Sequence, residues 1–473
     1  MADHLEHPVT ITERIALSGR VWPLYNLAKI AGFVGIIGSV AIGYFIDPAF
    51  RRFYFAYLVS LMFFVSISIG ALVFVLLQHL VRAGWSASVR RIAECLAACI
   101  PILGALSAPI ILSVILHRGD LYRWAQPAPA HAAHDAAPSA HEERGVDVKS
   151  SGQESRAVDE APAHRTSEPL AAHEQLTHEA HPSAKGVQPP DPLTLHKRPV
   201  LNRWFFTLRV VFYFAVWSLL ALWYWQRSTE QDKTGDVELT TRMQGYSAPA
   251  LVVLALSVTF ASFDLIMSLD PHWFSTIFGI YFLAGSIIAG FATMIIVLMH
   301  LQRLGYLHAS VNVEHYHDLG KWLFGFVFFW GYIAFSQFML IWYGNIPEET
   351  GWLARRGATT ARQDINGWSW VSIALLFGQL LIPFAGLMSR KAKRNKKVLA
   401  FWAMWLLAFH WLDLYWMIVP ELDGRVYFPF IEFLCFMGIG GIFMATSLRF
   451  MAKNPLRPLN DPRLEEALAF QNV

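Results

Sequence analysis

Two acidic side chains lie in apolar stretches that share one pattern. Residues 261–271 read ASFDLIMSLDP and residues 411–420 read WLDLYWMIVP. In each stretch an Asp-Leu pair is followed by five residues and then a proline. A charged carboxylate costs a few kcal/mol in lipid, so such residues face a bundle interior or a wet cavity. We therefore expect Asp264 and Asp413 to handle protons; the alternative is a structural hydrogen bond between helices.

Other ionisable side chains fall in apolar segments and extend this prediction. His410 is three residues from Asp413, which places both on one helix face. Carboxylates and imidazoles suit a proton relay because each can take up and release a proton. For His79 and His300 the alternative is a helix-end position with the side chain reaching the interface. The proton-path candidates are Asp264, His300, His410, Asp413, Glu94 and Glu432.

Motifs for redox cofactors and metals are missing from the sequence. Cys95, Cys99 and Cys435 all fall in apolar segments and form no Cys-x-x-Cys or iron-sulfur spacing. The histidines give no convincing pair of axial haem ligands. The glycines at 438–441 lie inside an apolar segment, where close helix packing explains them better than a phosphate loop. We expect no redox cofactor and no metal in this chain.

The apolar content of the chain predicts the elements that must hold these residues. Of 473 residues, 55% are hydrophobic and only 15% are charged, with a mean hydropathy of +0.38, which is typical of an integral membrane protein. Runs of about twenty apolar residues predict helices and exclude a barrel. The formal net charge of +3 implies no nucleic acid. We expect about ten transmembrane helices near 24–46, 53–80, 90–116, 204–225, 248–269, 273–300, 319–342, 367–388, 398–419 and 429–450.

Lysine and arginine in the short loops predict the orientation. Roughly twenty of them fall on the side of both termini against about six opposite, so both termini are expected in the cytoplasm. The basic residues of 390–397 are interpreted as part of this signal rather than as a lipid or partner site. The opening residues lack the positive start of a signal peptide. The expected parts are a cytoplasmic N-terminal segment (1–23), helices one to three (24–116), a periplasmic loop (117–203), helices four to ten (204–450) and a cytoplasmic tail (451–473).

The loop at 117–203 is rich in His, Ala and Pro. Its composition predicts a disordered, solvated linker. Metal capture is the alternative, but the histidines are irregularly spaced.

The shared aspartate pattern also predicts an internal repeat. Helices five and nine would both run outward, so helices two to five and six to nine would form two four-helix bundles. Helices one and ten would be peripheral.

Residues 316–350 carry a resemblance to a known family. They read YHDLGKWLFGFVFFWGYIAFSQFMLIWYGNIPEET, which resembles the NrfD/PsrC-like membrane subunits of bacterial alternative complex III. The resemblance extends from Arg20 to about Arg457 and includes the ASFDLIMSLDP stretch. It implies the NrfD-like fold, the bacterial inner membrane and a place in a complex that oxidises menaquinol or ubiquinol. Haem c and iron-sulfur clusters would belong to partner subunits.

The resemblance also implies partners and a division of labour. The partners would be an ActC-type sister subunit, a pentahaem cytochrome, an iron-sulfur subunit, small membrane subunits and lipids. In the family the sister subunit is the better candidate for quinol oxidation. This chain would then support assembly and conduct protons, and the family's polar half-channels would map onto His300, His410 and Asp413. Quinone binding at Asp264 is the alternative; a secondary transporter is a further one, distinguished by paired breaks in mid-span.

Overall fold

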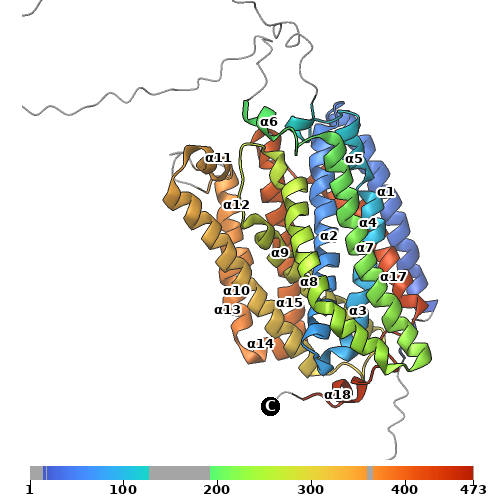
Figure 1. Ribbon diagram of the computed structural model, residues 1–473. Helices are drawn as coiled ribbons and strands as arrows, with labels where there is room; N and C mark the ends of the chain where they lie inside the picture. The colour runs from blue at the N-terminus through green and yellow to red at the C-terminus, as the bar shows by residue number, and fades with distance from the viewer. Residues whose placement is uncertain (1–13, 18, 127–191, 359–364, 366, 472–473) are drawn as a thin grey trace, which may run out of the picture. The chain divides into compact units, whose positions relative to one another are not determined.

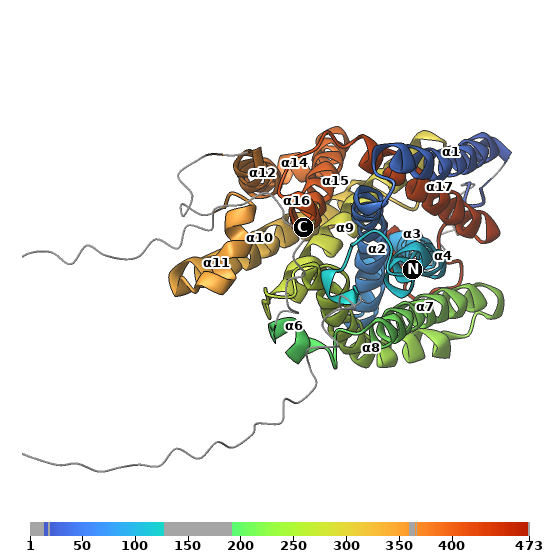
Figure 2. The same cartoon turned by 90° about the horizontal axis from the view of Figure 1, so that it is seen from above.

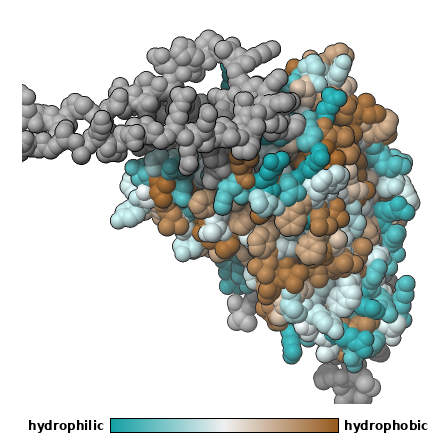
Figure 3. Space-filling model, turned by 45° about the horizontal axis from the view of Figure 1, so that its top comes forward, coloured by the Kyte–Doolittle hydropathy of each residue, from teal (hydrophilic) through white to brown (hydrophobic). Residues whose placement is uncertain are grey.

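A computed structural model describes residues 14–17, 19–126, 192–358, 365 and 367–471. These residues form helices and no sheet; their only bridge pairs Arg14 with Tyr306. Ten helical segments are long and apolar enough to cross a membrane, which confirms the expected all-α architecture with about ten spans. Exposed apolar side chains cover much of the surface over these helices (Figure 3).

The ten segments follow one another in simple order (Figure 1). The first two are α1 (Trp22–Ile46) and α2 (Arg51–Leu80), and the third combines α3 (Ala87–Ala97), α4 (Ile100–Leu106) and α5 (Ala108–Ile115). Then come α7 (Arg203–Thr234), α8 (Val237–Leu265), α9 (Phe278–Arg303) and α10 (Val313–Gly344). The last three are α12 (Gly367–Leu375) with α13 (Ile382–Met388), α15 (Lys396–Ile418) and α17 (Phe430–Lys453). Short helices are α6 (Pro192–Lys197), α11 (Pro347–Arg355), α14 (Arg390–Arg394), α16 (Pro420–Asp423) and α18 (Leu464–Leu468).

Two of the spans are interrupted, each at a proline. Pro101 and Pro109 fall near the starts of α4 and α5, where a missing N–H is tolerated. A π-helical turn at Leu376–Leu381 joins α12 to α13 just before Pro383. The indole of Trp405 donates to the carbonyl of Gly378 in this turn, at 2.7 Å. The break is thus supported by a side chain from α15.

The hairpin of α7 and α8 extends further than hydropathy predicted. The expected limits of 204–225 and 248–269 left 226–247 as a loop, but both helices continue to Thr234 and from Val237. Gly235 ends α7 in the left-handed region, at φ 68°. Asp236 caps α8 by accepting from the N–H of Glu238 at 2.9 Å. The caps, rather than the apolar limits, set the helix ends.

The spans pack around α2, which is buried along its whole apolar length. Its closest neighbour is α9, where an added Cβ on Gly70 would lie 2.0 Å from the carbonyl oxygen of Ser286. Gly290 faces Gly70 from the other side of this contact. The backbones of α2 and α9 therefore touch, as small residues allow.

Helices α1 and α17 form a closely packed antiparallel pair at the side of the bundle (Figure 2). An added Cβ on Gly35 would lie 2.3 Å from the backbone nitrogen of Gly438, and Gly441 faces Gly32 in the same way. The glycines near 438–441 thus serve helix packing, as predicted from the sequence.

Both described terminal segments lie at one end of the bundle. The N–H of Leu456, after α17, donates to the carbonyl of Ile15, before α1, at 2.7 Å. We call this the terminal end and the opposite one the loop end.

The described edges of the predicted periplasmic loop are folded onto the loop end, whereas 127–191 lie outside the described residues. The indole of Trp124 donates to Ser268 O at 3.1 Å, and Lys197 Nζ donates to Pro271 O at 2.5 Å.

Candidate functional site

Asp264 is the acceptor of a compact ion pair near the end of α8. Arg209 of α7 binds it with two nitrogens, Nε to Oδ2 and Nη2 to Oδ1, both at 2.7 Å. The phenol of Tyr213, one turn further along α7, donates to Oδ2 at 2.7 Å. Asp264 is 7% exposed, so the pair is largely removed from solvent. A two-pronged guanidinium contact of this kind holds the carboxylate in one orientation.

A second phenol, that of Tyr122, donates a hydrogen bond next to Asp264. The phenol of Tyr122 donates to the carbonyl of Leu265 at 2.9 Å. Burial, with a contribution from the charge of Asp264, raises the pKa of Tyr122 well above its usual range. Tyr122 therefore remains a proton donor, and the site is a satisfied network.

Asp413 has a different environment, in the interior between α15 and α9. It is 1% exposed and accepts a hydrogen bond from the phenol of Tyr281. The ring of Trp330, on α10, packs 5.4 Å from that of Tyr281. Among the described residues no ion pair is formed with Asp413. A buried carboxyl group with a phenol donor and no cation is costly to charge.

His410 lies one turn before Asp413 and faces α2. Its Nε2 is 2.8 Å from Ser66 Oγ. Its Nδ1 is buried without a hydrogen-bond partner in the described part of the chain. The ring lies against Gly285, where an added Cβ would be 3.1 Å from Nδ1. One nitrogen of a buried imidazole is thus left available.

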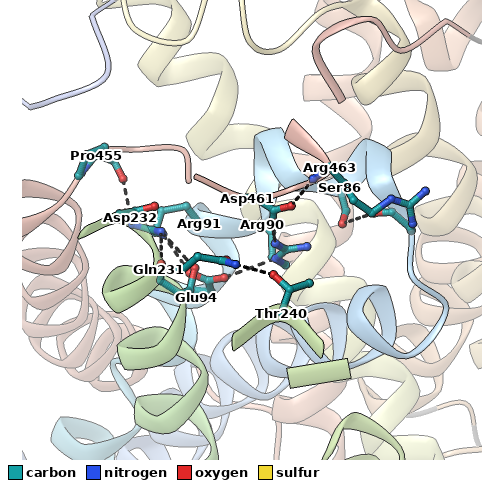
Figure 4. Close-up of polar contacts among 12 residues, drawn as sticks. Ser86, Arg90, Arg91, Glu94, Gln231, Asp232, Thr240, Pro455, Asp461 and Arg463 are labelled. Carbon is teal, nitrogen blue, oxygen red and sulfur yellow. Dashed lines mark hydrogen bonds and ion pairs between the residues drawn. The ribbon is translucent and has the colours of Figure 1, made fainter. Parts of the chain in front are cut away.

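Glu94 belongs to a charged cluster at the terminal end (Figure 4). Arg91 lies between two carboxylates, with Nε 3.0 Å from Glu94 Oε2 and Nη1 2.8 Å from Asp232 Oδ2. Arg90 contacts Asp461, and its Nε is 3.6 Å from Glu94 Oε1. All five side chains are buried or nearly so. Glu94 therefore lies within an ionic network that joins α3, α7 and the segment after α17.

Glu432 lies toward the loop end of the bundle, and His300 lies toward the terminal end. Glu432 is 1% exposed in the first turn of α17, with Arg52 Nη2 at 3.9 Å from its Oε2. The Oγ of Ser60, on α2, donates to the carbonyl of Glu432 at 3.3 Å. His300 is exposed near the end of α9 and lines an apolar groove. It does not point into the bundle interior.

A further buried cation at the loop end was not predicted. Arg356 is fully buried, stacks on the ring of Trp352 at 3.5 Å and pairs with Glu421 at 3.0 Å. Burial lowers its pKa to about 10, although Glu421 opposes the shift. The neighbouring Arg355 contacts Asp270 and Glu421. This cluster ties the segment after α8 to α11 and α16.

The six candidates are thus spread over several clusters. His410 and Asp413 lie together, whereas Asp264, Glu94, Glu432 and His300 each have separate surroundings. Arg209, the ion-pair partner of Asp264, was not predicted from the sequence because an arginine near the end of an apolar segment is expected to face the membrane surface. Arg209 and Asp264 lie almost equally far from the turn at Gly235 and Asp236. The register of that hairpin could have paired them if the turn had been recognised.

No metal site is apparent in the described ranges, since no group of three His, Cys, Asp or Glu side chains is suitably close. The three cysteines are free and buried.

Comparisons with known proteins do not identify a family. No model of a protein family matches the chain, and no curated protein does so either. The fold and the buried polar groups define the class: a multi-pass, all-α membrane protein with ten candidate spans.

Proposed function

We propose that this chain is a membrane subunit of a quinol-oxidising electron-transfer complex of the alternative complex III type, close to the shorter ActF subunit. It holds no redox cofactor of its own, supports assembly and conducts protons in a bacterial inner membrane, with both termini in the cytoplasm. The observation that carries the proposal is the interior polar pair of His410 with Ser66 and Asp413 with Tyr281. The resemblance of residues 316–350 supplies the kind of complex.

Helix α2 supports the proton-conducting part of the proposal because it contacts several of the polar clusters. The Oγ of Ser60 donates to the main-chain carbonyl of Glu432, and the Oγ of Ser66 is 2.8 Å from His410 Nε2. Gln78 and His79, near the terminal end of α2, are buried with polar atoms that lack partners among the described residues. Buried atoms of this kind are the positions that ordered water would occupy. A water-assisted path along α2 would join the loop-end half of the bundle to the cluster around Glu94.

The environment of Asp264 argues for quinol oxidation in the ActC-type sister subunit. Arg209 and Tyr213 donate to the two carboxylate oxygens, and an adjacent guanidinium makes a carboxylate a poorer acceptor for a proton from a bound quinol. In this proposal Asp264 stabilises the fold, and its role as a proton-path candidate stays a prediction.

The transporter alternative receives no support from the helix breaks. They fall in the third and eighth spans, at α4–α5 and at the π turn before α13. The expected repeat pairs the third span with the seventh, and α10 is continuous.

The experiment is purification through a tag on this chain from native membranes, with identification of co-purifying subunits and a haem c and iron-sulfur spectrum. We expect a pentahaem cytochrome, an iron-sulfur subunit and the sister subunit, with quinol-oxidising activity. Recovery of the chain alone, without redox cofactors, would overturn the proposal.

For proton conduction, the Asp413→Asn complex should keep its subunits and lose proton movement. If the Asp413→Asn complex moves protons at the wild-type rate, the proposal that this chain conducts protons is wrong.

A further inference from the structure

A long apolar groove opens on the side of the bundle between α1, α2, α9, α15 and α17. Its volume is about 950 Å³. The wall on α17 is an unbroken helical stripe in which residues are spaced by three or four positions. This stripe consists of Phe433, Met437, Gly440, Met444, Leu448 and Met451.

The groove is long enough to cross the hydrocarbon layer. Its lining extends along α17 from Pro429 to Met451, which corresponds to about 33 Å at the helical rise of 1.5 Å per residue. The hydrocarbon core of a bilayer is about 30 Å thick. At the terminal end the lining includes Leu24 and His300. The groove therefore opens at the level where lipid head groups begin.

Cationic side chains lie around this mouth. Arg303 is one turn beyond His300 on α9 and is exposed. Lys397, which the sequence assigned to the topology signal and not to a lipid site, is exposed on α15, on the same helical face as the groove residues Ala408 and Trp411. The contact of its neighbour Lys396 with Gln302 Oε1, at 2.7 Å, fixes Lys397 at the level of the mouth. Within the described ranges neither Arg303 nor Lys397 forms an ion pair.

One polar atom on the wall also lacks a partner. Thr293 lies two helical turns from His300 on α9, and its Oγ1 is buried with no hydrogen bond within the described part of the chain. This hydroxyl lies about 15 Å along α9 from Arg303, at the depth of acyl chains rather than of head groups.

We propose that the groove is a binding site for an anionic diacyl phospholipid, with an acyl chain along α17 and the phosphate between Arg303 and Lys397. Apolar walls match the acyl chain, while the two cations match the phosphate of the head group. Basic pockets between spanning helices bind anionic lipid head groups. The site does not depend on membership of a quinol-oxidising complex.

The first experiment measures the lipid retained by the tagged full-length protein, with its native partners, after purification in mild detergent. Phospholipids are extracted and quantified by mass spectrometry per mole of protein. The double variant Arg303→Gln/Lys397→Gln should lower retained phosphatidylglycerol and cardiolipin at least threefold. The control Arg390→Gln/Lys391→Gln removes two exposed cations from the same end of the bundle and should retain the wild-type amount. Equal retention in both double variants would overturn the proposal.

A second experiment tests the groove without relying on retention. The melting temperature is measured in nanodiscs of phosphatidylcholine with and without phosphatidylglycerol. The added anionic lipid should raise the melting temperature of the wild type and of Ala408→Val, but not of Ala408→Trp, whose larger side chain fills the groove. An equal rise in Ala408→Trp would contradict the proposal. So would an isoprenoid quinone recovered from the groove, or a partner helix cross-linked to position 408.

Discussion

Asp264 and Asp413 share a sequence pattern but occupy opposite kinds of environment. Asp264 lies near the loop end and is bound by the guanidinium of Arg209, whereas Asp413 accepts from the phenol of Tyr281 and forms no ion pair among the described residues. The helix that supplies Arg209 is the fourth span, α7. Its expected counterpart in the second half, 367–388, contains no lysine or arginine. A repeated pattern on one helix therefore does not imply repeated chemistry, because the partners come from other helices.

Removal of Arg209, the cation that distinguishes the surroundings of Asp264 from those of Asp413, should have the largest effect on stability. Replacing it with Met leaves the Asp264 carboxylate buried without a cation, which should destabilise the protein by about 4 kcal/mol. The double variant Arg209→Met/Asp264→Asn should recover more than half of this loss. Thermal unfolding in mild detergent checks both. The control Arg242→Met removes an exposed pair with Glu238 and should cost less than about 0.5 kcal/mol. No recovery in the double variant would show that Arg209 acts through packing instead.

The contact between α2 and α9, which belong to different halves of the expected repeat, is the next place to test. Gly70→Ala should destabilise the protein by about 3 kcal/mol, because the new Cβ would meet the backbone of α9 at Ser286. Gly245→Ala is the matched control, since this helical glycine of α8 has no atom within 4 Å of an added Cβ. It should leave stability unchanged or raise it by about 1 kcal/mol. Equal effects of the two substitutions on the melting temperature would contradict the close contact.

Parallel substitution of the two aspartates sharpens the comparison. Asp264→Asn leaves Arg209 without its anion and should cost about 2 kcal/mol. Asp413→Asn keeps an acceptor for Tyr281 and should change stability by less than about 1 kcal/mol. The two melting temperatures, measured in the same detergent, give the difference. Reversal of this order would mean that Asp413 is the charged structural residue.

The smallest expected effect concerns Ser66. Ser66→Ala removes the contact with His410 Nε2 and should cost about 1 kcal/mol, the usual value of one buried hydrogen bond. Ser68→Ala is the control, because Ser68 donates only to the carbonyl of Leu96. If proton movement in the complex falls in Ser66→Ala and not in Ser68→Ala, His410 belongs to the path. Equal rates would exclude Ser66 from it.

The number and order of the spans could be predicted because long apolar runs in lipid have few alternatives to helices. The ends of α7 and α8 could not be predicted from hydropathy. Polar residues that lie beyond the apolar run of α7 remain helical up to Gly235. The candidate residues were recognised as buried, with the exception of His300. The hydrogen-bond partners of these residues were not predicted. The contact of Arg209 with Asp264 depends on the register of the α7–α8 hairpin, and the contact of Tyr281 with Asp413 depends on the packing of α9 against α15.

The contact of Arg90 with Asp461 has a consequence for the synthesis of the protein. Arg90 is in the third span, and its partner emerges from the ribosome 371 residues later. Until then the nascent chain presents Arg90 without that anion, at the end of a helix that is already in the membrane. Closure of this contact therefore comes late in synthesis, and a product truncated before Asp461 would leave Arg90 with the carboxylate of Glu94, 3.6 Å away, in place of two carboxylates.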